Sequence, residues 1–155
     1  MLVKLDINDY LYEIEVDTNE TLLNVLRERL DLTGAKRGCN SNNCGACKVL
    51  IDGVDVKSCS TLARNVQNKK IYTIESFATS EMLHPIQYAF IEAGAVQCGY
   101  CTPGMIITTQ ALLNRNSSPA EGEIREAFKD NLCRCTGYVK IIEAVKLASK
   151  KLEEN

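Results

Sequence analysis

The residues best able to do chemistry in this chain are its eight cysteines, and the chain has only one histidine, His84. Thiolate sulfur binds metals and takes part in redox reactions, and both roles bring several sulfurs together. The N-terminus lacks the long apolar core of a signal peptide, so we expect a cytoplasmic chain whose thiols stay reduced. In that compartment an even number of cysteines indicates metal ligands rather than disulfides.

The first set of cysteines has the spacing of a ligand loop for a [2Fe–2S] cluster. Cys39, Cys44 and Cys47 follow the pattern C-x4-C-x2-C, and Cys59 comes after an Asp-Gly turn at residues 52–53. This is the plant-type ferredoxin arrangement. The loop is rich in Gly and Asn, which tolerate positive φ, so its backbone can turn inward and direct N–H groups at the sulfurs. The alternative is a structural zinc site, which usually shows two short cysteine pairs.

The second set consists of two short pairs, Cys98 with Cys101 and Cys133 with Cys135. Each pair precedes an expected helix, and the positive end of the helix dipole favours thiolates. Taken alone, the C-x-x-C pair could be a thioredoxin-like redox pair or half of a zinc site. The C-x-C pair is unusual for structural zinc, so the four residues together favour a second metal cluster.

Composition and motifs exclude several other functions. The net charge is −2 and the sequence pI is about 5.5, which argues against a nucleic-acid-binding protein. No apolar run approaches the roughly 18 residues that a membrane span needs. His84 has no apparent catalytic partner and is expected to begin a helix, and no serine lies in a nucleophile motif. We therefore expect no catalytic residue in this chain.

The elements that position the first set form an α+β unit. Leucines at helical spacing predict one helix over residues 21–30. Asn8–Asp9 and Asp52–Gly53 are the expected hairpin turns. Alternating or continuous apolar residues predict strands over residues 3–7, 10–16, 49–51, 54–56 and 71–74.

The second half is expected to be helical throughout. Helix starts are predicted at Pro85, at Thr102–Pro103 and at Ser118–Glu121, and the spacing of apolar residues over 141–152 predicts a last helix. Residues 75–83 show no clear period. The expected organisation is a first domain over 1–75, a linker over 76–83 and a helical domain over 84–155.

Four segments of the chain resemble the iron–sulfur subunit of the xanthine oxidase family of molybdenum hydroxylases. The similarity extends over essentially the whole chain and includes the small subunits of carbon monoxide, nicotinate and 4-hydroxybenzoyl-CoA enzymes. The segments that carry it are Gly38–Cys47, Ser58–Ala63, Gln97–Met105 and Asn131–Tyr138.

The resemblance implies two [2Fe–2S] clusters, one in a plant-ferredoxin-like (β-grasp) domain and one in a four-helix-bundle domain. It implies a complex with a large molybdopterin-binding subunit, which holds the substrate site, and a medium FAD-binding subunit. The chain would carry electrons from molybdenum through the helical-domain cluster and then the ferredoxin-like cluster to FAD or another acceptor. The implied ligands are Cys39, Cys44, Cys47 and Cys59 for the first cluster and Cys98, Cys101, Cys133 and Cys135 for the second.

The resemblance also assigns two contacts with the partner's pterin cofactor, from Gln97 and from Cys135. Two positions depart from the family pattern: Asn42 stands where glycine is usual, and Asp130 where a small residue is common. Because Asn can adopt the left-handed conformation, we expect the loop around Asn42 to keep its shape. Asp130 is expected to alter the local surface or the potential of the second cluster.

Two other classes of protein remain open at this point. A free two-cluster ferredoxin would be a soluble electron carrier and would need no molybdenum subunit. A zinc-binding interaction module would use the same cysteines without redox chemistry.

Overall fold

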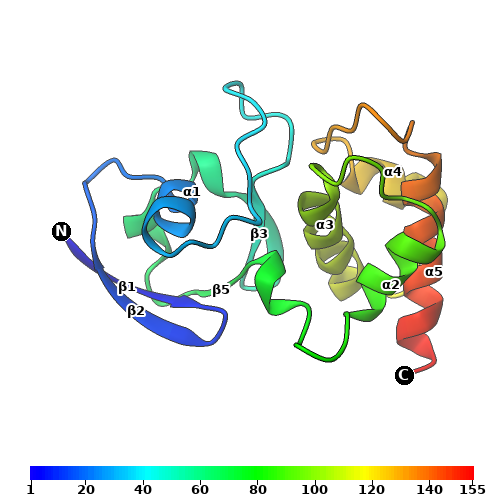
Figure 1. Cartoon of the computed structure of the whole chain (residues 1–155), viewed down its shortest axis with the longest axis horizontal. Helices are drawn as coiled ribbons and strands as arrows, with labels where there is room; N and C mark the ends of the chain where they lie inside the picture. Colours follow the sequence, from blue (N-terminus) through cyan, green and yellow to red (C-terminus); the bar gives the residue numbers. More distant parts are fainter.

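The computed structural model describes residues 1–155, in which a sheet half is followed by a helical half (Figure 1). The sheet half contains strands β1 (Leu2–Ile7), β2 (Tyr10–Glu15), β3 (Lys48–Ile51), β4 (Val54–Lys57) and β5 (Lys70–Tyr72). Its helix α1 (Leu22–Asn24) continues directly into a π-helical turn, η1 (Val25–Arg29). The helical half contains α2 (Pro85–Glu92), α3 (Thr102–Arg115), α4 (Glu121–Ala127) and α5 (Val139–Glu153). No helix is both long enough and apolar enough to cross a membrane.

The sheet is mixed, with strand order β2-β1-β5-β3-β4. Both expected hairpins are confirmed: β1 pairs antiparallel with β2 around Asn8–Asp9, and β3 with β4 around Asp52–Gly53. All four turn residues have positive φ, which Asn, Asp and Gly tolerate best. Strand β1 runs parallel to β5, so the chain crosses over between them, and the crossover contains α1 and the first cysteine loop.

The last strand is shorter than the expected 71–74. It ends at Tyr72, because the Asn8 side chain accepts the Thr73 N–H at 2.9 Å and donates to the Thr73 hydroxyl at 2.9 Å. The chain then enters a 3₁₀ turn at Ile74–Ser76. A side chain 65 residues away thus takes the place of a strand partner.

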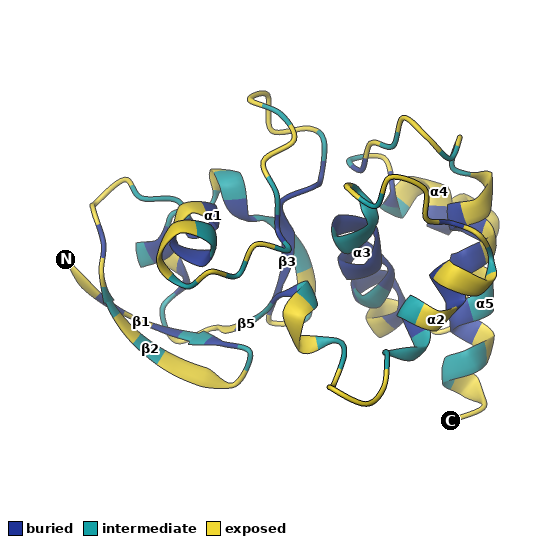
Figure 2. Ribbon diagram, viewed as in Figure 1, coloured by how far each residue is buried: buried dark blue, intermediate teal, exposed yellow.

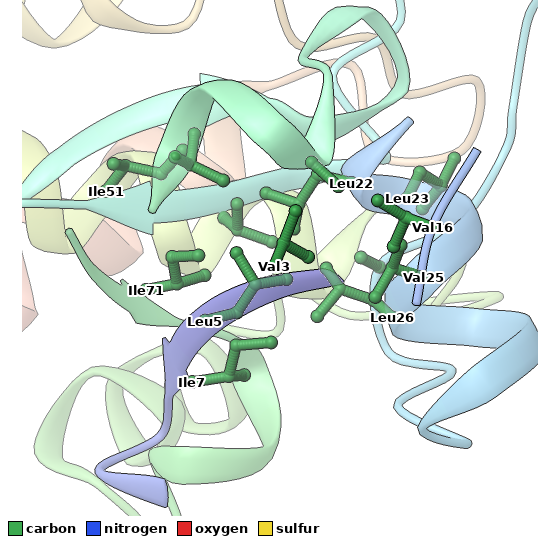
Figure 3. Packing of buried hydrophobic residues seen from close by; sticks show 14 of the residues in the cluster. Val3, Leu5, Ile7, Val16, Leu22, Leu23, Val25, Leu26, Ile51 and Ile71 are labelled. Atoms are coloured by element: carbon green, nitrogen blue, oxygen red, sulfur yellow. The ribbon is translucent and has the colours of Figure 1, made fainter. Parts of the chain in front are cut away.

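One face of the sheet packs on α1 and η1 and forms the first core (Figure 3). The inward residues of β1 alternate with exposed ones, as the period-2 pattern predicts. Val3, Leu5 and Ile7 are fully buried against the leucines of the helical segment, Leu22, Leu23 and Leu26.

The helical half has its own core, made by all four helices. Its largest fully buried side chains include Phe90, Met105, Ile124 and Ile141. His84 begins α2 as expected: its Nδ1 accepts the Ile86 N–H at 3.2 Å, and the Gln87 side chain accepts the His84 N–H at 2.9 Å. This reciprocal cap satisfies backbone donors that the first turn leaves free.

Two helices have a different N-cap residue from the one that the sequence pattern predicts, which is Thr102 for α3 and Ser118 for α4. Helix α3 begins at Thr102, so Cys101 and not Thr102 is its N-cap residue. Helix α4 begins at Glu121, and the Glu123 carboxylate accepts the Ala120 N–H at 2.7 Å. Ser118 therefore does not cap α4 as its sequence context predicted.

The two halves meet where β3 faces α3, and both elements are buried on that side (Figure 2). Leu50 of β3 packs against Ile107 and Ala111 of α3. Two glycines allow the closest approach, because a Cβ on Gly104 would lie 2.3 Å from the carbonyl oxygen of Gly45. The backbones of the two halves are thus in direct contact beside Cys44.

This contact makes Gly104→Ala a test of the packing between the halves. The added methyl would clash with backbone, which cannot move aside, so we expect a loss of about 1–3 kcal/mol in the free energy of unfolding. Gly122→Ala in α4 is the matched control, because nothing lies within 4 Å of the added Cβ. The control should gain about 0.4–1 kcal/mol, as an alanine in a helix does. Urea unfolding measures both, and equal midpoints for the two variants would contradict the close approach.

Candidate metal centres

The β3–β4 hairpin brings the third and fourth cysteines of the first set together. Lys48 pairs with Lys57, so Cys47 and Cys59 lie just beyond the open end of the hairpin. The Ser58 hydroxyl donates to the Cys47 carbonyl at 2.6 Å and holds the two ends together. As a result, the sulfurs of Cys47 and Cys59 are 3.3 Å apart.

The loop before β3 folds back on itself and carries the other two cysteines of the set. Asn42 has a φ of 58° and Gly45 a φ of 75°, so the expectation that Asn42 adopts the left-handed conformation is confirmed. This inward turn directs the N–H groups of Asn43 and Cys44 at the sulfur of Cys39 and lowers its pKa to about 6. Backbone donors thus favour the thiolate at Cys39.

The thiols of Cys44 and Cys59 lie in a less favourable environment for negative charge. Burial, followed by the neighbouring sulfurs of Cys47 and Cys39, raises the pKa of Cys59 to about 11. Burial also raises the pKa of Cys44. These four sulfurs lie close enough for each to affect the titration of another, and a bound cation would relieve their repulsion.

The second set is assembled from the start of α3 and the segment before α5. Burial, followed by the neighbouring Cys133 and Cys98, raises the pKa of Cys101 to about 12. Cys135 interacts with Cys98 in the same way, and that contact raises the pKa of Cys135. Each pair of the sequence therefore contributes one sulfur to each of two close contacts.

Hydrogen bonds from Thr136 favour the thiolate at Cys133. Burial alone would raise its pKa, but Thr136 lowers it, because the Thr136 hydroxyl and N–H donate to the sulfur at 3.2 and 3.4 Å. The Tyr138 hydroxyl accepts the Cys133 N–H at 2.9 Å and fixes the backbone at this point.

The sulfurs approach one another as pairs rather than around one point. No group of three or more His, Cys, Asp or Glu side chains is arranged to hold a single metal ion. A [2Fe–2S] cluster has four cysteine ligands shared between two irons, so it needs two thiolates on each side. The pairing of sulfurs and the backbone donors beside them fit such a cluster in each half.

Both sets of cysteines border one cavity of about 330 Å³ between the halves. The cysteine loop before β3 and the segment before α5 both lie along the upper side of the molecule in the view of Figure 1. Tyr100 crosses the gap, since its hydroxyl donates to the Arg37 carbonyl at 2.8 Å. The cysteines that line the cavity are Cys39, Cys44, Cys98, Cys101, Cys133 and Cys135.

The predicted pterin contacts lie at the surface of the helical half. Gln97, Cys98 and Cys135 are exposed, whereas Cys47 is buried. Asp130 is half exposed and lies 3.7 Å from Lys57, so it faces the sheet half beside Asn42.

Two buried polar residues next to the cysteines, Lys48 and Asn131, were not predicted from the sequence. The sequence feature that could have indicated Lys48 is the segment K-V-L-I, in which a lysine begins an otherwise apolar strand.

The pKa differences predict how the metal-free chain reacts with iodoacetamide. At pH 7 Cys39 is mostly thiolate and Cys101 is thiol, so Cys39 should react far faster, with a half-maximal rate near pH 6. Because folding lowers the pKa of Cys39 from 9.0, the metal-free fold should become more stable as the pH rises from about 6 to 9. Mass spectrometry of peptides after brief alkylation measures each site. In urea all eight cysteines should react alike, and the same uniform reaction in the folded chain would contradict the assignment.

Two family models together cover most of the chain. The model described as "2Fe-2S iron-sulfur cluster binding domain" matches residues 5–73, and the model "[2Fe-2S] binding domain" matches residues 73–146. The chain is 45% identical to the nicotinate dehydrogenase small FeS subunit of Eubacterium barkeri, over 96% of this chain and 95% of the relative. It is 42% identical to a probable xanthine dehydrogenase subunit of Bacillus subtilis, over 87% of this chain and 78% of the relative.

A solved structure shares the whole architecture. A chain of quinoline 2-oxidoreductase from Pseudomonas putida 86 superposes with a TM-score of 0.94 at 38% identity, covering 100% of this chain and 97% of that one. Identity at this level over nearly full length, together with the two family models, shows the family. The chain belongs to the [2Fe–2S] iron–sulfur subunits of the xanthine oxidase family of molybdenum hydroxylases.

Proposed function

We propose that this chain is the electron-transfer subunit of a molybdenum hydroxylase complex and performs no substrate chemistry itself. The observation that carries the proposal is the sorting of eight cysteines into two sets of four, with members of both sets lining one cavity. The small FeS subunit of nicotinate dehydrogenase, to which the chain is similar over nearly its full length, supports the same role.

The proposed ligands follow the two sets. The first cluster would be held by Cys39, Cys44, Cys47 and Cys59, and the second by Cys98, Cys101, Cys133 and Cys135. When bound, each [2Fe–2S] cluster accepts and releases one electron at a time, which divides a two-electron oxidation at molybdenum into single steps toward an acceptor. The chain's own contribution is to supply thiolates, to direct N–H donors at them and to hold the two sites next to one shared cavity.

The proposed domains are a β-grasp, plant-ferredoxin-like domain over 1–75, a linker over 76–83 and a four-helix bundle over 84–155. The separate cores of the sheet and helical halves support this division. The linker is not free of the fold, because Phe77 packs on the helical core. We propose a large molybdopterin-binding subunit as partner of the helical half and a medium FAD-binding subunit as a further partner.

The ligand assignment predicts that each site can be lost without the other. Cys44→Ser should remove only the first cluster and Cys101→Ser only the second, because each set belongs to a half with its own core. Electron paramagnetic resonance of the dithionite-reduced protein should show two distinct signals in the wild type and a different one of them in each variant. The two variants are matched controls for each other. If either change removed both signals from a folded chain, the assignment would be wrong.

We further propose that Gln97 and Cys135 contact the pterin of the large subunit. Both are exposed, Gln97 directly before Cys98 and Cys135 within the second set itself, so a partner can reach them. The Gln97 amide offers donors and an acceptor, which suits the polar edge of a pterin or its phosphate. The Cys135 sulfur can accept a hydrogen bond from the pterin while it binds iron.

Gln97→Ala should leave both clusters intact and slow their reduction by substrate several-fold. One neutral hydrogen bond is worth about 0.5–1.5 kcal/mol, so complete loss is not expected. Rapid-mixing reduction of the assembled complex, with molybdenum content measured in parallel, checks the prediction. Gln110→Ala on α3 is the control, because that side chain bonds Asn114 of its own helix at 2.8 Å. Unchanged rates and full molybdenum content in Gln97→Ala would show that Gln97 makes no such contact.

A further inference from the structure

A buried lysine lies between the two halves, directly after a proposed cluster ligand. Lys48 follows Cys47 at the start of β3 and is only 5% exposed. Its Nζ lies 2.7 Å from the Asp55 carboxylate of β4, within the sheet half. It also donates across to the helical half, to Asn131 Oδ1 at 2.7 Å and to Thr108 Oγ1 at 3.1 Å. The ammonium thus binds three oxygen atoms from three separate segments.

The helical side of this network is equally buried and well connected. Asn131 is 2% exposed, and its Nδ2 donates to the Gly104 carbonyl at 3.3 Å. Its Oδ1 accepts from Thr108 at 3.1 Å as well as from Lys48. A buried ion pair contributes little net stability compared with apolar packing. What such a network supplies instead is one defined arrangement of the groups that it joins.

The groups that it joins are the backbones of the two cysteine loops. Lys48 is next to Cys47, and Asn131 lies two residues before Cys133. Immediately beside Asn131, the Leu132 N–H donates to the Cys44 carbonyl at 2.8 Å. The backbones of the two loops are already in contact, because a Cβ added to Gly45 would lie only 2.4 Å from the Asp130 carbonyl oxygen. A second link, from Lys57 to Asp130 at 3.7 Å, is half exposed and weaker.

We propose that Lys48 and Asn131 are a pair of positioning residues whose hydrogen bond fixes the segment 131–135 against the loop 44–47. Through this contact they set the separation of the two cysteine sites. Electron transfer depends steeply on distance, so a fixed separation gives a fixed rate between the sites. The electron-transfer consequence rests on the proposed function, whereas the loop contact is independent of it.

Hydrogen exchange at the Leu132 amide reads the loop contact directly. In the iron-loaded complex we compare wild type, Lys48→Met, Asn131→Leu and the double variant by mass spectrometry of peptic fragments. Each single change should speed exchange at Leu132 by roughly 10- to 100-fold, since a hydrogen bond to a charged group is worth about 1.5–3 kcal/mol. The double variant should be no faster than the single ones, because both changes break the same bond.

Two controls separate positioning from a general loss of stability. Val3→Ala weakens the first core without removing any group of the Lys48–Asn131 network, and it should leave Leu132 exchange unchanged in the folded complex. If Lys48→Met does not fold, Thr108→Val keeps the ion pair of Lys48 with Asp55 and removes only the hydroxyl that bridges Lys48 and Asn131, and it should speed exchange by a smaller factor. Unchanged exchange in Asn131→Leu, or additive effects in the double variant, would overturn the proposal.

The magnetic interaction between the two reduced clusters gives the second readout. In Asn131→Leu both resonance signals should persist, while the splitting that each causes in the other decreases because the sites are less firmly held together. Retained splitting would overturn the positioning role. Faster Leu132 exchange in a protein that shows no iron signals at all would overturn the proposed function and still support the loop contact.

Discussion

Gathering negatively charged sulfurs in a small space is the constraint on which the rest of the structure depends. Burial and neighbouring thiols raise the pKa of Cys59 to about 11 and that of Cys101 to about 12, so neither set favours four thiolates without a cation. The fold compensates with donors: backbone N–H groups at Cys39, and the hydroxyl and N–H of Thr136 at Cys133. Positive φ at Asn42 and Gly45 is what turns the first loop inward.

The same constraint explains why two small cores are needed rather than one. A hairpin end supplies Cys47 and Cys59, whereas the starts of α3 and α5 supply the second set, and each scaffold is held by its own apolar core. The close contact of Gly45 with Gly104, and the network around Lys48, then join the scaffolds beside their cysteines. The two sites therefore share one cavity although they belong to different halves.

Local features of the fold could be predicted from the sequence, and long-range ones could not. The turns at Asn8–Asp9 and Asp52–Gly53, the cap at His84 and the spacing of the first cysteine set depend on neighbouring residues. The early end of β5 depends on Asn8, and the burial of Lys48 depends on Asn131, 83 residues away. The spacing of apolar residues along the sequence carries no information about partners that are so distant in the chain. The ligand sets themselves came from motif spacing and family resemblance, since periodicity carries no information about metals.

A native mass spectrum of the intact complex is the sharpest test of the electron-transfer role. We expect this chain to carry about four irons and four sulfides and to be bound to a subunit that contains molybdenum. Controlled dissociation should release the chain with both clusters still attached. A chain that is found alone, or that carries zinc in place of iron, would rule out this role.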